Sequence, residues 1–400
     1  MRRLGNLSGT TEPVAAGLLG VSGSSGGRSG PVPLLSDRHS GRGIRGLAGV
    51  LLGAALLWPA AASAQITWKP SWAFRYRDYY DPVSAEPRAA QTQVLFPGRS
   101  SSFPYAVNPG QSFAWDINLG QEIPIIGWEG NRTISDHDPV PPSSKGKKQF
   151  AFGLWFPLSF HMVEDMGKDE SNPILNTDYR FGGMLKAQVG LPDKWGPIQQ
   201  GHIGLRYVFL AHESTHVGDE FTLAATRIYG DKFQRVNVSY EYWELGGSFE
   251  PNFEFRDKKL NRLEMKFRYG LIRPYNQQKG WYTSELLQPP GTHATPSVRN
   301  FEPYADFEAF LAPDPDKGTL GPFVSLDFRN RTVYGYNRPV GTQEQVEGSL
   351  NIMAGVRQIR AGAAIRPSYY LRYYHGVNPA GQFRSQSNYQ LYGFGVMFQF

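Results

Sequence analysis

The chain has 400 residues, of which 19% are charged and 14% are aromatic, and it contains no cysteine. The absence of cysteine excludes a disulfide framework and a thiolate metal site. Residues 1–64 hold six of the 41 basic residues and two of the 35 acidic ones, so they carry most of the net charge of +6. The remainder is close to neutral, and we expect no nucleic-acid partner.

The N-terminal 64 residues have the features of an extension followed by an export signal. Residues 1–41 are rich in Gly, Ser and Pro without periodicity, which predicts a disordered extension. Arg42 and Arg45 then precede an apolar run over 47–58 and the small residues Ala62-Ser-Ala64. This order predicts a signal peptide over residues 42–64 that is cleaved after Ala64, with an uncleaved anchor helix as the alternative.

From residue 112 onwards, apolar and polar side chains alternate with the period of two that is typical of strands. The polar positions carry full charges of both signs, which favours a membrane barrel whose charges pair in the lumen while its apolar face meets lipid. We therefore expect an all-β fold, a transmembrane antiparallel up-and-down β-barrel of about 12 strands over residues 112–400. Residues 65–111 should be mostly irregular, with room for one strand. Eleven strands are recognisable, near residues 112–119, 149–162, 178–191, 202–216, 235–242, 262–271, 302–312, 320–331, 346–357, 362–375 and 392–400.

The C-terminus is an alternating aromatic strand, Tyr392-Gly-Phe-Gly-Val-Met-Phe-Gln-Phe400. A last strand that ends in Phe resembles the assembly signal of bacterial outer-membrane barrels. The resemblance implies that the barrel-assembly machinery recognises Phe400 and that outer-membrane lipid surrounds the barrel. Together with the export signal, it predicts location in the bacterial outer membrane.

Connection lengths predict the orientation of the barrel. The short connections are 313–319 and 358–361, and the long ones are 274–301, 331–345 and 376–387. Such barrels have short periplasmic turns, long outer loops and a periplasmic C-terminus, so the strand over 202–216 should run outward and 217–233 should be an outer loop. Residues 122–148 are long where a short turn is expected, and we interpret them as a periplasmic hairpin or a plug.

A cluster of titratable side chains ends the strand over residues 202–216. Counting by two from Arg206 places His212, Ser214 and His216 on the same polar face, towards the lumen. A symmetric hairpin with the next strand would put His212 near Asn237 and Ser214 near Arg235. We expect a supporting lumen cluster made of Arg206, His216, Asp219, Glu220, Arg235 and Ser239.

The triplet His212-x-Ser214 predicts a nucleophile beside a base. The two side chains project to one side of a strand, and Asn237 or Glu241 could orient the imidazole, so the candidate catalytic residues are His212, Ser214, Asn237 and Glu241. Over these few residues the pattern resembles outer-membrane phospholipase A and the lipid A 3-O-deacylase, whose His-x-Ser pair faces lipid near the outer leaflet. That resemblance implies hydrolysis of lipid acyl esters, although Thr215 stands where those families usually have Asn.

Two other interpretations of the same residues remain open. The string His212-Glu-Ser-Thr-His216 matches H-E-x-x-H, but that zinc chemistry needs one helical turn, and here the string follows an alternating strand. We expect no cofactor, with a divalent metal as the alternative. The cluster could also be a hydrogen-bonded network that supports the outer loop, with Gly218-Asp219-Glu220 forming a turn.

The string His-Glu-Ser-Thr-His-Val-Gly-Asp-Glu over residues 212–220 also resembles the signature of a whole family. Its members are uncharacterised bacterial outer-membrane proteins of about this length with a domain of unknown function and a similar His-x-Ser-Ser-His-x-Gly-Asp-Glu string, in which Thr215 here replaces the second Ser. The resemblance implies a shared fold but no activity. The two functional hypotheses are therefore a lipid hydrolase and a non-enzymatic barrel, either a narrow solute pore or a structural surface protein.

Overall fold

The structure is a computed structural model that describes residues 66–70, 82–87, 89–100, 114–130, 150–165, 174–191, 198, 200–219, 222–223, 238–255, 260–275, 301–313, 320–333, 345–359, 365–381 and 388–399. The expected extension over 1–41, the expected signal peptide over 42–64 and the terminal Phe400 lie outside these residues. Within the described ranges, no helix has the length and hydropathy needed to cross a membrane.

Thirteen strands are found in the described part of the chain. They are β1 (Ile66–Pro70), β2 (Thr92–Ser100), β3 (Ala114–Gly130), β4 (Phe150–Asp165), β5 (Ile174–Gly190), β6 (Gln200–Val217), β7 (Val238–Glu254), β8 (Leu260–Tyr275), β9 (Glu302–Pro313), β10 (Leu320–Val333), β11 (Gln345–Gln358), β12 (Arg366–Gly376) and β13 (Tyr389–Gln399).

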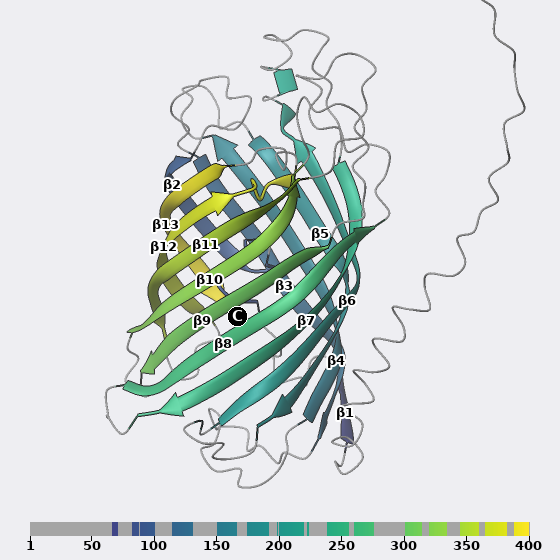
Figure 1. Cartoon of the computed structure of the whole chain (residues 1–400), viewed down its shortest axis with the longest axis vertical. Helices are drawn as coiled ribbons and strands as arrows, with labels where there is room; N and C mark the ends of the chain where they lie inside the picture. Colours follow the sequence, from purple (N-terminus) through teal and green to yellow (C-terminus); the bar gives the residue numbers. More distant parts are fainter. Residues whose placement is uncertain are drawn as a thin grey trace, which may run out of the picture. The chain divides into compact units, whose positions relative to one another are not determined.

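Strands β2 to β13 form a closed antiparallel barrel of 12 strands (Figure 1). Each strand pairs with its neighbour in sequence, and β13 returns to pair with β2, where Phe394 lies opposite Phe96. The short strand β1 pairs with the part of β3 that β2 does not reach. In this pairing Trp68 lies opposite Trp128. The expected up-and-down barrel of about 12 strands is confirmed.

Two boundaries differ from the expectation. The barrel begins with β2, before residue 112, because this strand supplies the pairing that closes the barrel. Strand β3 runs to Gly130, so the first part of the 122–148 segment is wall and not a hairpin or plug. A register shift between Pro124 and Ile126 breaks the alternation there, which explains why the sequence pattern is lost. Residues 131–149 lie outside the described residues.

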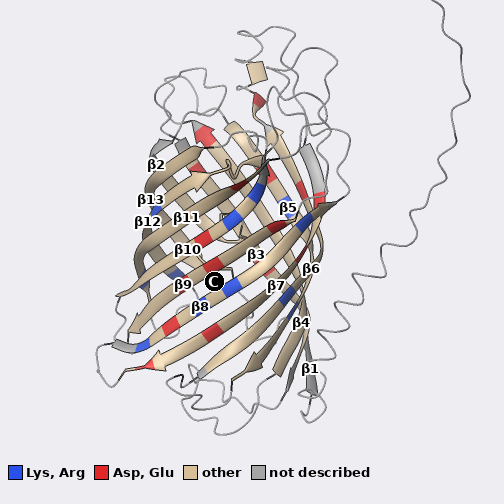
Figure 2. Ribbon diagram, viewed as in Figure 1, with Lys and Arg blue, Asp and Glu red and all other residues tan. Residues whose placement is uncertain are grey.

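The two faces of the barrel wall differ in polarity. Large apolar side chains stay exposed on the outer face, among them Tyr269 at 69% and Leu371 at 67%. Charged side chains of both signs lie along most strands (Figure 2) and are buried on the inner face. An apolar exterior around a charged interior is the arrangement of a transmembrane barrel of the outer-membrane type.

The buried charges form ion pairs on the inner face of the barrel wall. Arg206 on β6 lies 3.4 Å from Glu122 on β3 and 3.5 Å from Glu244 on β7. Lys186 on β5 also pairs with Glu122. On the other side of the barrel the pairs are Arg268–Asp306 at 3.3 Å, Arg329–Asp327 at 2.7 Å and Arg357–Glu308 at 3.0 Å. The expected pairing of lumen charges is confirmed for these residues.

Two segments that are not strands of the wall also fill the lumen. Residues 82–87 and 89–91, written below as 82–91, lie inside the barrel, where Val83 and Ala85 have no exposed surface. Residues 377–381 enter as well, and the Gly381 backbone N–H donates to Asp178 at 3.2 Å. The sequence suggested a plug at 122–148. The structure instead places residues 82–91 in the lumen, and this segment has no periodic pattern that could have predicted its position.

Two tyrosines reach across glycines to join strands that are not neighbours. The buried Tyr370 on β12 passes over Gly395 on β13, and its hydroxyl donates to Gln93 on β2 at 3.1 Å. Tyr304 on β9 passes over Gly270 on β8 and donates to Glu244 on β7 at 2.7 Å. The missing glycine side chain leaves the space for each ring, so the Tyr370 contact fastens the seam where the barrel closes.

We expect Gly395→Ala to destabilise the barrel by about 1–3 kcal/mol, because the new methyl group overlaps the Tyr370 ring. Tyr370→Phe should cost only about 1 kcal/mol, the value of one hydrogen bond. Urea unfolding in detergent, followed by the heat-dependent gel shift, measures both. Gly247→Ala is the matched control, since its methyl group meets only the carbonyl oxygen of Gly204, at 3.9 Å. If Gly395→Ala and Gly247→Ala lower the free energy of unfolding equally, the Tyr370 contact does not stabilise the closure of the barrel.

Candidate functional site

A β-bulge in β6 determines where the predicted site residues point. Val208 lies opposite Glu244 on β7, but the next paired residue, Ala211, lies opposite Tyr242. Phe209 and Leu210 therefore face the single residue Trp243, and both are exposed on the outer face. One extra residue moves every later side chain of the strand to the opposite face.

Two glycines on the neighbouring strand β5 accommodate this bulge. The Phe209 ring occupies the space where a side chain on Gly183 would lie, and the Leu210 carbonyl contacts the backbone at Gly182. A larger residue at either position would collide with the bulged strand. The Gly182-Gly183 pair is thus the signal in the sequence that could have indicated the bulge.

The bulge reverses the predicted orientation of three residues. Arg206 lies before the bulge and faces the lumen, as predicted. His212, Ser214 and His216 lie after it and face outward, so the prediction that they face the lumen is wrong. Glu213, which the alternation had placed outside, is buried on the lumen side.

The outward residues form two close pairs. Ser214 Oγ lies 3.0 Å from His216 Nε2, within hydrogen-bonding distance. His212 Nδ1 lies 3.9 Å from an oxygen of Glu241, which is its partner in the β6–β7 register. The Ser–His hydrogen bond therefore joins Ser214 to the histidine that follows it, and not to His212 as expected.

Aromatic side chains of β5 support both imidazoles. The His216 ring meets the edge of Tyr179, with ring centres 5.7 Å apart. The His212 ring packs on Phe181 at 5.0 Å. Tyr179 and Phe181 are both exposed on the outer face, which confirms that the two histidines lie on the lipid side of the wall.

The β6–β7 hairpin also differs from the symmetric hairpin that we expected. Ser214 lies opposite Ser239, and pairing stops at Thr215 opposite Val238. Asp219 is exposed just after β6. The remaining predicted residues, Glu220, Arg235 and Asn237, lie outside the described residues.

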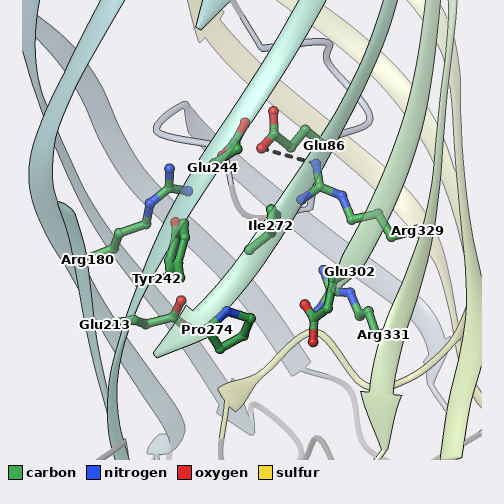
Figure 3. A pocket seen from close by; sticks show the side chains of 10 residues that line it. All are labelled: Glu86, Arg180, Glu213, Tyr242, Glu244, Ile272, Pro274, Glu302, Arg329 and Arg331. Carbon is green, nitrogen blue, oxygen red and sulfur yellow. Dashed lines mark ion pairs between the residues drawn. The ribbon is translucent and has the colours of Figure 1, made fainter. Parts of the chain in front are cut away.

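The inner side of the same wall contributes to a small cavity (Figure 3). Glu213 and Arg180 line one side of it, and Glu86 from the inserted segment pairs with Arg329 on the other side. Sequence analysis missed Glu213 and Glu86, because one depends on the bulge and the other lies in an irregular segment.

The geometry does not support the zinc interpretation of the H-E-x-x-H string. Glu213 points into the lumen while His212 and His216 point outward, so the three side chains do not converge on one point. No group of three or more metal-binding side chains is found among the residues that the structure describes.

No family model matches the chain, and no curated protein matches it. Among solved structures, the chain is similar to the beta domain of the Bordetella autotransporter Brka, with 12% identity, 78% of this chain and 97% of that chain covered, and a TM-score of 0.35. It is also similar to the translocator domain of NalP from Neisseria meningitidis, with 11% identity, 89% and 96% coverage and a TM-score of 0.31. A third similar structure is the transport unit of AIDA-I from Escherichia coli, with 10% identity, 80% and 93% coverage and a TM-score of 0.30. These similarities are too low to transfer any property to this chain.

Single cysteines can test the orientation without background, because the chain has none. In proteoliposomes we expect Ser214→Cys to react with a lipid-soluble maleimide, since residue 214 is on the outer face. Thr215→Cys should be protected, because Thr215 has no exposed surface on the lumen side. Faster reaction at 215 than at 214 would show that the bulge does not set the register.

Proposed function

We propose that the outward face of β6 and β7 is a site for hydrolysis of acyl esters in membrane lipids. The observation that carries the proposal is the hydrogen-bonding distance of 3.0 Å between Ser214 Oγ and His216 Nε2, on a surface that faces lipid. A hydroxyl next to an imidazole is the requirement for an activated serine nucleophile.

The position of the pair favours a catalytic role over a purely structural one. Polar groups in the acyl region of a membrane cost free energy, so imidazoles and a hydroxyl on the outer face belong near the membrane surface. His216 is the penultimate residue of β6, close to the end of the strand. This end of the wall meets the interface between headgroups and acyl chains, where the ester bonds of lipids lie.

Each residue has a chemical role in the proposed reaction. His216 accepts the proton of Ser214 as the Oγ attacks the ester carbonyl, and it then returns the proton to the departing alcohol. Water, activated by the same imidazole, hydrolyses the acyl-serine and releases the fatty acid. His212, held near Glu241, can donate a hydrogen bond to the developing oxyanion. Asn237, which the sequence suggested as a residue that orients the imidazole, keeps that proposed role.

The location of the protein is part of the proposal. The apolar outer face, together with the predicted export signal and terminal Phe400, supports insertion into a bacterial outer membrane by the barrel-assembly machinery. The long connections after β6, β8, β10 and β12 lie at the end of the barrel that holds Ser214, which supports an extracellular position for the site, although the connection between β3 and β4 at the other end is also long. Lipid of the outer leaflet is then the substrate.

A non-enzymatic barrel is the second candidate, and the filled lumen favours it. Buried ion pairs and the segment 82–91 occupy the bore, as expected for a barrel that is closed at rest. In that case the outward histidines support only the loop that follows β6.

We expect the purified barrel to be labelled by a fluorophosphonate ester probe and to release fatty acid from phospholipid in mixed micelles. Ser214→Ala should abolish both, and His216→Gln should reduce hydrolysis by about a thousandfold or more, since it removes the base. Ser248→Ala is the control, because Ser248 is buried on the lumen side. Equal labelling of wild type and Ser214→Ala, or no fatty acid release by wild type, would leave the non-enzymatic barrel.

Labelling of intact cells tests the proposed orientation separately. A cysteine at Ser284, in the long connection between β8 and β9, should react with an impermeant maleimide. A cysteine at Asp316, in the short connection between β9 and β10, should react only after the cells are broken. The opposite pattern would place the site at the periplasmic end.

A further inference from the structure

Residues 82–91 are held in the lumen by contacts with several strands of the wall. The Ser84 backbone N–H donates to Glu308 at 2.7 Å, and the Ser84 hydroxyl accepts from Arg357 at 3.0 Å. The Ala85 backbone N–H donates to Ser325 at 2.9 Å, and the amide of Asn351 donates to the Ala85 carbonyl. These contacts come from β9, β10 and β11, and Asn118 on β3 donates to the Ala89 carbonyl at 2.9 Å. All of them involve single groups, not the continuous ladder that fixes a strand of the wall.

The centre of the segment is the carboxylate of Glu86, which is 2% exposed. Arg268 on β8 lies 2.8 Å from one of its oxygens, and Arg329 on β10 lies 3.1 Å from the other. Each oxygen is thus held by a different guanidinium, and such charge-assisted contacts select planar anions. Arg268 and Arg329 together form what we call the arginine clamp.

The arginine clamp is also anchored to the wall of the barrel. Arg268 also lies 3.3 Å from Asp306, and Arg329 lies 2.7 Å from Asp327. If Glu86 leaves, each guanidinium keeps its contact with an aspartate of the wall, and this contact holds it in position. The clamp therefore stays in place when the segment moves, and another carboxylate can take the position of Glu86.

We propose that the arginine clamp is a binding site for small carboxylate solutes, and that residues 82–91 are a displaceable plug whose Glu86 occupies this site. A free carboxylate competes with Glu86 for Arg268 and Arg329, and its binding shifts the plug away from the clamp. Because the plug fills the lumen beside the cavity of Figure 3, binding controls access to the interior of the barrel.

The test measures how fast a cysteine in the plug reacts with a water-soluble maleimide in the purified full-length barrel. Val83→Cys is the reporter, because Val83 has no exposed surface and its side chain carries no polar group. Gluconate is the carboxylate probe, and glucose and glucosamine are neutral and cationic controls of similar size. We expect gluconate to accelerate the labelling of residue 83 in a saturable way, and the two controls to have no effect.

Removing the charge of Glu86 should release the plug without any ligand. In the Val83→Cys background we expect Glu86→Gln to raise the labelling rate about a hundredfold, because the charge-assisted contacts of Glu86 with Arg268 and Arg329 are lost. Gluconate should accelerate labelling little further in this variant. Glu254→Gln is the matched control, since Glu254 is an exposed residue at the end of β7.

A second reporter separates release of the plug from loosening of the whole barrel. Thr215→Cys is buried in the same lumen but on β6, away from the clamp, and its labelling should not change. The proposal is overturned if gluconate acts no more strongly than glucose, or if Glu86→Gln leaves residue 83 protected. Equal acceleration at residues 83 and 215 would overturn it as well. The gluconate experiment uses protein that keeps Glu86, so it tests the proposal even if the Glu86→Gln variant does not fold.

Discussion

Charge compensation inside the lumen is the constraint on which the rest of the structure depends. The inner face of this barrel carries many buried charges, and they pair with charges on nearby strands or on the inserted segment. A buried charge without a partner is strongly destabilising, so each strand must present its charges at the height of an opposite charge. Arg206 illustrates this, because it reaches both Glu122 and Glu244 and so fixes β3, β6 and β7 relative to one another. Glu86 also has opposite charges beside it, although it belongs to a segment that is not part of the wall.

Alternation along the strands predicted much of this architecture, because burial of one face imposes a period of two that can be recognised locally. Eleven strands, the lumen position of Arg206 and the pairing of lumen charges followed from it. The strand that closes the barrel was harder to recognise, since β2 contains Pro97 and follows an irregular segment. The plug was not predictable from the sequence, because most of the hydrogen bonds that hold it come from strands more than 180 residues away.

The candidate site shows the limit of the same rule. His212, Ser214 and Glu241 were singled out for sound chemical reasons, and the structure does place them on one face with His216. Their direction was wrong because the rule assumes that no residue is inserted, and Phe209 breaks that assumption. The cause lies on another strand, where Gly182 and Gly183 leave the space for the bulge, so it cannot be found by counting along β6.

The bulge also explains how one strand can serve two environments. Beyond it, outward residues alternate with the buried Glu213 and Thr215, so each residue of the Ser214–His216 pair is flanked by a side chain anchored in the lumen. Thr215 donates to Asn176 on β5 at 3.3 Å, and Glu213 lines the cavity beside Glu86. These inner contacts hold the backbone between Ser214 and His216, which is what a short hydrogen bond on a lipid-facing surface requires. The packing of Glu213 and Thr215 in the lumen therefore determines the geometry of Ser214 and His216 on the outer face, because all four residues share one short stretch of backbone.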